Sequence, residues 1–166
     1  MNFNDLYNAS ANVEDSPTYE DNILEGPDAL PNDERVTAKI AYCKAGTSKG
    51  SGAPQWINKL EITSGEYQGG QFWDTITLSV KTSDGAKRYN KAQFAKLAAA
   101  GVTPEFLASN PSQEAIEAVL KDSTVDVIIN WEKPDADGKV WSRHVWTEAA
   151  DPSTGGYVPG QAPAGY

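Results

Sequence analysis

Two predicted strands and the loop that joins them occupy residues 35–63, RVTAKIAYCKAGTSKGSGAPQWINKLEIT. Apolar and polar side chains alternate along residues 35–44 and again along 55–63, which indicates two strands that each bury one face. In the first strand, the apolar face is formed by Val36, Ala38, Ile40 and Tyr42. The ten residues between the strands include three glycines, two serines and a proline, so a mobile loop is expected there.

A third strand is predicted at residues 71–80. Its core face is expected to hold Phe72, Asp74, Ile76, Leu78 and Val80. Trp73 takes the opposite face of this strand, and Lys59 takes the opposite face of the strand before it. An aromatic ring and a cation are therefore expected together on the face away from the core.

The hydrophobic period then changes to helical spacing. Residues 90–101 predict a helix, because apolar residues recur there every three or four positions and Asn90 suits the N-cap. Thr103-Pro104 and Asn110-Pro111 predict two further short helical segments, since proline is favoured in the first turn of a helix.

Alternation returns at residues 124–133 and 139–148, which predict a closing hairpin. The chain is therefore expected to be mainly β, with a helical insertion between the third and fourth of five strands. That is the order of the OB-fold, a small, partly open, five-stranded Greek-key barrel. A five-stranded α+β sheet with its helices on one face has the same order of elements, so the sequence leaves that alternative open.

The charge is distributed unevenly over three parts of the chain. Residues 1–34 hold nine acidic residues and no Lys or Arg, so we expect an acidic arm that is largely extended or disordered. Within this arm, local docking is possible for Phe3, Leu6, Tyr7, Ile23 and Leu24. Residues 35–150, the expected OB-like domain, hold all 14 basic and 13 acidic residues, and residues 151–166 are expected to form a flexible Gly/Pro-rich tail. The net charge of −9 therefore does not exclude a nucleic-acid ligand for the domain.

The chain has few residues that could act in catalysis or bind a metal. The chain has one cysteine, Cys43, and one histidine, His144, and it contains no P-loop, HExxH or CxxC motif. We expect no enzyme, no metal and no cofactor. No apolar run approaches the roughly 18 residues of a membrane span, and the first ten residues do not have the pattern of a signal peptide, so a cytoplasmic protein without membrane contacts is expected.

Five tryptophans is a high number for 166 residues, and all five lie on predicted strands. Aromatic rings on strands are stacking platforms for unpaired bases. Trp73 is the best candidate for such a platform. Trp56 is a second one, although it is also in phase with the apolar Leu60. Trp141 shares a face with Arg143, whereas Trp131 and Trp146 are in phase with apolar neighbours and are expected in the core.

Basic side chains near these rings are candidates for phosphate contacts. They lie on the predicted strands, in the Gly/Ser-rich loop and ahead of the predicted helix: Lys39, Lys44, Lys49, Lys59, Lys87, Arg88 and Arg143. Together with the tryptophans, these cations predict an interface that binds single-stranded DNA without sequence preference.

Four motifs add a family resemblance. They are LEGPDALP at 24–31, CKAGTSKGSG at 43–52 followed by Gln55-Trp56, GEYQGGQFWD at 65–74, and WEKPDADGKVWSRHVW at 131–146. In these motifs the chain resembles bacteriophage single-stranded-DNA-binding proteins of the OB type. The resemblance implies an OB-fold and a role in phage DNA replication or recombination in the host cytoplasm. It also implies a ligand on the face of the second and third strands, at Lys44, Lys49, Trp56, Lys59 and Trp73.

The C-terminus departs from the related pattern of cellular single-strand binders, which end in an acidic tip, because this chain ends in APAGY. Any recruitment of replication or recombination proteins would then fall to the acidic arm. An alternative function is a protein-interaction module, a phage factor that binds a host or phage protein through that arm. A carbohydrate-binding module is a second alternative, since tryptophans also stack on sugars. The sequence leaves the choice between DNA and RNA open, and an oligomer is possible.

Overall fold

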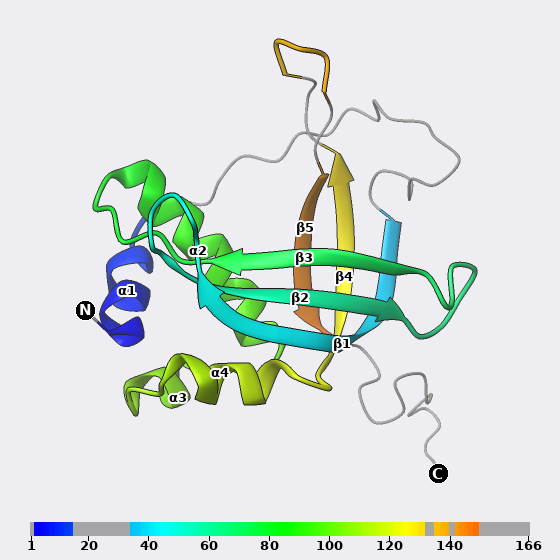
Figure 1. The fold of residues 1–166 in the computed structure, drawn as a ribbon, viewed down its shortest axis with the longest axis horizontal. Helices are drawn as coiled ribbons and strands as arrows, with labels where there is room; N and C mark the ends of the chain where they lie inside the picture. The colour runs from blue at the N-terminus through cyan, green and yellow to red at the C-terminus, as the bar shows by residue number, and fades with distance from the viewer. Residues whose placement is uncertain (1, 15–33, 132–134, 140–141, 150–166) are drawn as a thin grey trace.

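Five strands form one antiparallel sheet in the computed structural model, which describes residues 2–14, 34–131, 135–139 and 142–149. The strands are β1 (Glu34–Thr47), β2 (Pro54–Ile62), β3 (Gln71–Thr77), β4 (Thr124–Trp131) and β5 (Ser142–Glu148). They follow the spatial order β3-β2-β1-β4-β5, and the sheet curls into a half-barrel (Figure 1). The expected mainly-β class is confirmed, and the half-barrel is compatible with an OB-like fold.

The long strand β1 connects the two halves of the sheet. Its first residues, Glu34 to Thr37, pair with β4, Ala38 and Lys39 pair with both β4 and β2, and the residues from Ile40 onward pair with β2. Figure 1 shows β1 bending from the β4–β5 side to the β2–β3 side. This bend lets one strand serve both halves, so the sheet can curl around a single core.

A β-bulge in β1 changes which side chains face that core. Ile40 pairs with Leu60 but Tyr42 pairs with Lys59, so Ala41 is an extra residue. Before the bulge Ile40 is buried, and after it Cys43 is buried while Tyr42 is 46% exposed. The prediction that Tyr42 shares the core face is therefore wrong, because a bulge shifts the alternation by one residue.

Three helices follow β3 and precede β4: α2 (Asp84–Ala99), α3 (Pro104–Ala108) and α4 (Gln113–Leu120). The predicted start of the first helix at Asn90 is wrong. Ser83 is the N-cap, and its hydroxyl accepts a hydrogen bond from the Ala86 N–H at 3.2 Å. The predicted start at Thr103-Pro104 is confirmed, because Thr103 caps α3 in the same way.

A further helix, α1 (Phe3–Ser10), lies in the part of the chain expected to be an extended arm. Its N-cap Asn2 accepts a hydrogen bond from the Asp5 N–H at 2.8 Å. Phe3 and Tyr7 pack against Trp56 and Phe94, with ring centroids 5.5 Å and 5.4 Å apart. Apolar contacts therefore order these residues, whereas residues 15–33 of the arm and the tail from residue 150 lie outside the described residues.

The apolar core fills the concave side of the half-barrel and extends under the helices. Its largest fully buried side chains are Trp56, Ile40, Leu60, Ile76, Leu78, Leu97, Leu107, Ile116 and Leu120. Trp146 is also buried, as its phase predicted. Within the described part of the chain, no helix combines the length and the apolar character needed to cross a membrane.

A buried polar network joins the two edge strands; we call it the polar seam and define it as Asp74, Lys96, His144 and Trp146. The Asp74 carboxylate on β3 accepts hydrogen bonds from Lys96 Nζ at 3.1 Å and from Trp146 Nε1 at 2.7 Å. His144 Nδ1 on β5 lies 3.2 Å from the same carboxylate. The polar seam thus ties β3 to β5 and to α2 across the open side of the sheet.

Candidate nucleic-acid interface

The outer face of β1–β3, meaning the face that points away from the core, carries a row of three side chains. Tyr42, Lys59 and Trp73 lie opposite one another on three adjacent strands, because β1 pairs Tyr42 with Lys59 and β3 pairs Trp73 with Lys59. We call these three residues the aromatic row. The register of the sheet therefore brings together side chains that are up to 31 positions apart in the sequence.

The geometry of the aromatic row is well defined. Lys59 Nζ lies 5.5 Å from the centroid of the Trp73 ring, within the range of a cation–π contact. The rings of Tyr42 and Trp73 meet edge to face, with centroids 6.0 Å apart and planes at 77°. These contacts hold the indole in place although 57% of Trp73 remains exposed.

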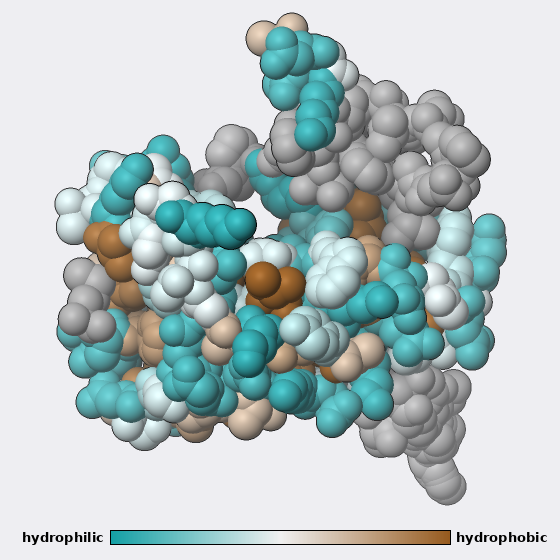
Figure 2. All heavy atoms as spheres, in the orientation of Figure 1, coloured by the Kyte–Doolittle hydropathy of each residue, from teal (hydrophilic) through white to brown (hydrophobic). Residues whose placement is uncertain are grey.

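An exposed tryptophan in such a position is an open stacking surface. A cation–π contact at an exposed site contributes only about 0.5–1 kcal/mol, which is far less than full burial of the ring would contribute. The fold thus leaves the indole available to a planar ligand. Figure 2 shows this side of the molecule, where pale side chains of intermediate hydropathy and a hydrophobic patch between them lie over β1–β3, with hydrophilic side chains around them.

Most of the predicted phosphate contacts carry a charge without a carboxylate partner. Among the residues that the structure describes, no ion pair neutralises Lys44, Lys49, Lys59, Lys87 or Arg88. Lys44 does lie close enough to Glu117 to help lower the pKa of that carboxyl, after the Ala45 N–H, which donates to it at 2.7 Å. Unpaired cations are the ones that can bind a phosphate without first breaking a contact.

Two other predicted cations are placed differently. Lys39 forms an ion pair with Asp122 at 3.4 Å, so its charge is partly neutralised. Arg143 is half-buried on β5, opposite Asn130, and so lies outside the outer face of β1–β3. The structure therefore does not bring Arg143 to the aromatic row.

The prediction that Trp56 is a stacking residue is wrong. Its side chain is fully buried, and Nε1 donates a hydrogen bond to the Gln113 carbonyl at 3.0 Å. A base cannot reach this ring while the domain is folded, because Trp56 is in phase with Leu60 on the core side of β2. Trp141, the remaining predicted stacking residue, lies outside the described residues.

The structure adds residues that were not predicted for this site. Tyr42 joins the aromatic row only because of the bulge, and no feature of a regular alternation reveals it. Lys81, exposed beyond the end of β3, adds a cation near the start of α2. The backbone hydrogen bond from the Leu78 N–H to the Pro54 carbonyl, 3.0 Å, brings this segment beside the end of the Gly/Ser-rich loop that carries Lys49. The unpaired cations therefore gather toward this end of the sheet.

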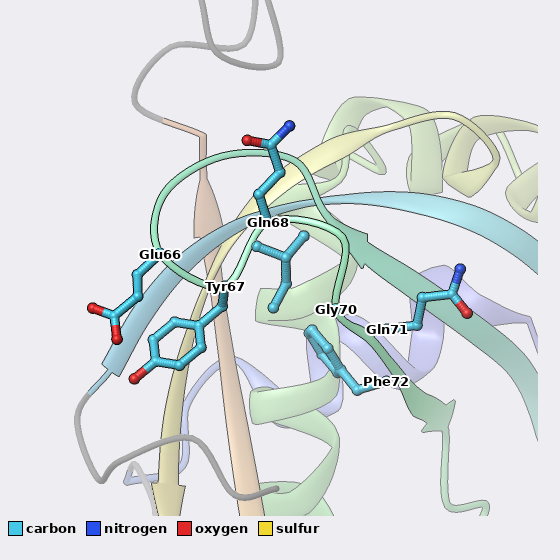
Figure 3. Close-up of a pocket in the computed structure, with 7 residues that line it drawn as sticks. Glu66, Tyr67, Gln68, Gly70, Gln71 and Phe72 are labelled. Atoms are coloured by element: carbon cyan, nitrogen blue, oxygen red, sulfur yellow. The ribbon is translucent and has the colours of Figure 1, made fainter.

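The opposite end of the sheet has a different character. A pocket of about 260 Å³ lies under the β2–β3 turn and is lined in part by Ile62, and Figure 3 shows the rings of Tyr67 and Phe72 there. The rim includes Glu66, and Glu61 is exposed on the neighbouring part of β2. These carboxylates repel phosphates, so the outer face is polarised from an acidic turn to a basic loop.

The two residues that could serve as nucleophile and base are held in structural positions. Burial, with a further contribution from Glu117, raises the pKa of Cys43 to about 12, so the thiol stays protonated at neutral pH. The Asp74 carboxylate beside His144 is shared with Lys96 and Trp146. No cluster of three or more metal-ligating side chains occurs in the ranges for which coordinates are described.

No protein-family model matches this chain, and no curated protein sequence matches it either. The functional interpretation therefore depends on the geometry of the outer face.

Proposed function

We propose that this chain binds single-stranded DNA through the outer face of β1–β3, without sequence preference, and acts in phage DNA replication or recombination. The observation that carries the proposal is the aromatic row, in which an exposed Trp73 lies beside Lys59 and Tyr42. Stacking on an aromatic ring accepts any base, because every base has a π-face. Unpaired lysines nearby attract the phosphates.

The arrangement of the strands supports the same proposal. The edge strands β3 and β5 face each other across the polar seam, and the curled five-stranded sheet is compatible with an OB-like fold. OB-folds commonly bind oligonucleotides on the face of strands 2 and 3. In this chain Lys59 and Trp73 lie on those two strands.

Ionic strength provides a quantitative expectation. The unpaired cations allow about four phosphate contacts, and each contact with a single strand contributes about −0.7 to the slope of log affinity against log salt. The expected slope of log affinity against log salt is therefore about −3. A carbohydrate ligand would show no such slope, so the same titration distinguishes the two ligand classes.

The test is a titration with oligo-dT, followed by tryptophan fluorescence and by anisotropy of a labelled strand, at low and moderate salt. Trp73→Ala with Lys59→Ala is expected to reduce affinity at least tenfold, since stacking contributes about 1–3 kcal/mol per base. Trp73→Phe, which keeps a ring, is expected to retain most of the affinity. Lys121→Ala is the charge-matched control, because Lys121 lies at the end of α4 and not on the outer face.

The proposal is wrong if the double variant stays folded and binds oligo-dT as tightly as the unchanged protein. It is also wrong if the unchanged protein does not bind at low salt. In that case a protein partner becomes the better explanation of the exposed row. Loss of partner binding when Asp15, Glu20, Asp21, Glu25 and Asp28 are changed to Asn or Gln, which leaves α1 in place, would support the acidic arm as its contact.

A further inference from the structure

Helix α2 runs along the free edge of β3 and is fixed to this strand and to the segment that follows it. The Asn90 amide donates to the Ser79 carbonyl at 2.9 Å and accepts from the Ser79 N–H at 2.8 Å, as a neighbouring strand would. The Tyr89 side chain lies near Thr77, the last residue of β3. Lys96 contacts Asp74. The first turns of α2 therefore lie beside the end of β3, and the helix continues antiparallel to the strand.

Tyr89 is the exposed aromatic residue at this junction. Its side chain is 43% exposed and lies near Thr77, whose hydroxyl donates to Gln55 Oε1 at 3.4 Å. Burial raises the pKa of Tyr89. The ring is thus partly buried and partly open, as the ring of Trp73 is.

Thr77 and Trp73 are on the same side of β3, because they are four residues apart and side chains alternate along a strand. Four residues of a strand span roughly 13 Å. Stacked bases of one nucleic-acid strand follow each other at about 3.4 Å, so one base cannot contact both rings. Trp73 and Tyr89 therefore offer two separate stacking positions, and between them lies the exposed side chain of Thr75.

Charge accompanies both positions. Lys59 lies beside Trp73, and Lys87 and Arg88 lie in the first turns of α2 with Tyr89, although on other faces of the helix. Neither Lys87 nor Arg88 is ion-paired within the described ranges, and the exposed Asp84 is the nearest acidic residue in the sequence of α2. Two positive charges and one negative charge leave the start of α2 attractive to a phosphate.

We propose that Tyr89, with Lys87 and Arg88, forms a second subsite for an unpaired base and its phosphate, so that a bound single strand runs along β3 from Trp73 to the start of α2. This inference rests on the proposed function, because it takes the same ligand. It adds a direction to the path and a binding residue, Tyr89, on a helix instead of a strand.

The experiment measures the affinity of the full chain for oligo-dT of increasing length. The proteins are the unchanged chain, Tyr89→Ala, Tyr89→Phe and Trp73→Ala, each checked for folding by circular dichroism. Tyr89→Ala is expected to bind long oligonucleotides about tenfold more weakly and the shortest binding oligonucleotide equally well. Tyr89→Phe keeps the ring and is expected to follow the unchanged protein at every length. Trp73→Ala is expected to lose affinity at every length.

Three results overturn the inference and leave the proposed function intact: Tyr89→Ala binds long oligonucleotides normally while Trp73→Ala does not, Tyr89→Ala loses affinity equally at all lengths, or Tyr89→Phe loses as much as Tyr89→Ala. The last result would show that the hydroxyl of Tyr89 matters and the ring does not. Failure of the unchanged protein to bind any length would overturn both proposals.

Discussion

Trp73 and Asp74 are consecutive residues of β3, and their side chains leave the sheet on opposite faces. The Trp73 indole is exposed on the outer face, whereas the Asp74 carboxylate is buried in the polar seam. Because β3 is an edge strand with β2 as its hydrogen-bonded neighbour, the polar seam supplies the contacts on its other side. The platform for a ligand and the closure of the half-barrel therefore depend on the same short strand.

Substitution of Asp74 is expected to destabilise the domain. Asp74→Asn leaves the buried Lys96 ammonium without its counter-charge, and breaking one side of a buried ion pair costs about 3–5 kcal/mol. Urea denaturation measures the change. The matched control is Asp122→Asn, which removes an exposed ion pair with Lys39 and retains a residue type that tolerates positive φ, so a change within about 0.5 kcal/mol is expected. Equal stability of the two variants would contradict a structural role for the polar seam.

Acid is expected to weaken the fold through the same carboxylate. Burial alone would raise the pKa of Asp74, but the hydrogen bond from His144 and the charge of Lys96 outweigh it and lower the pKa below 3.8. As pH falls, the unfolded chain therefore binds a proton at Asp74 before the folded chain does. The contribution of ionised Asp74 to the free energy of unfolding is complete above about pH 4 and is lost below it. Urea midpoints measured from neutral pH down to strongly acid pH test this, and Asp74→Asn is expected to show a weaker acid dependence. An unchanged acid dependence in that variant would rule Asp74 out as its source.

Tyr42 is expected to contribute to binding and little to stability. Tyr42→Ala removes one ring of the aromatic row, and a loss of about 1 kcal/mol or more in oligo-dT affinity is expected because stacking contributes about 1–3 kcal/mol per base. Val145→Ala is the control, since Val145 is also an exposed apolar side chain but lies on β5 and not on β1–β3. If both variants bind alike, the aromatic row does not extend to β1.

Trp56 is expected to show the opposite behaviour. Trp56→Ala removes a fully buried ring that packs against Phe3, so a loss of about 3–5 kcal/mol in the free energy of unfolding is expected. Trp56→Phe retains much of the volume and loses the hydrogen bond to the Gln113 carbonyl, so a smaller loss is expected with unchanged oligo-dT affinity. A folded Trp56→Phe protein with selectively weakened binding would show that this ring does reach the ligand.

Regular alternation explains why the strands were predictable from the sequence. Lys59 and Trp73 were assigned to the outer face, and Asp74 to the core side, because strict alternation holds through β2 and β3. The partners of Asp74 were not predictable, since Lys96 and His144 are 22 and 70 positions away and only the curl of the sheet brings them together.

Local competition between signals explains the failures. Ser83 and Asn90 are both good N-cap residues, and the sequence alone does not decide between them. In the structure Ser83 caps the helix, and the Asn90 side chain bonds the backbone of Ser79 instead of a helix end. The helix α1 has too short an apolar pattern to stand alone, and its order comes from contacts of Phe3 and Tyr7 with distant aromatic residues.

The bulge at Ala41 is the one place where β1 carries a residue that its neighbour β2 does not match. Without Ala41, Ile40 and Tyr42 would be consecutive and would keep their partners Leu60 and Lys59, so simple alternation would leave Tyr42 on the outer face and Cys43 in the core. A one-codon deletion at this position would thus preserve both faces of β1 and remove only the local bend and added twist of the bulge. Related chains with and without this residue would present the same aromatic row, and comparing them requires alignment by strand register.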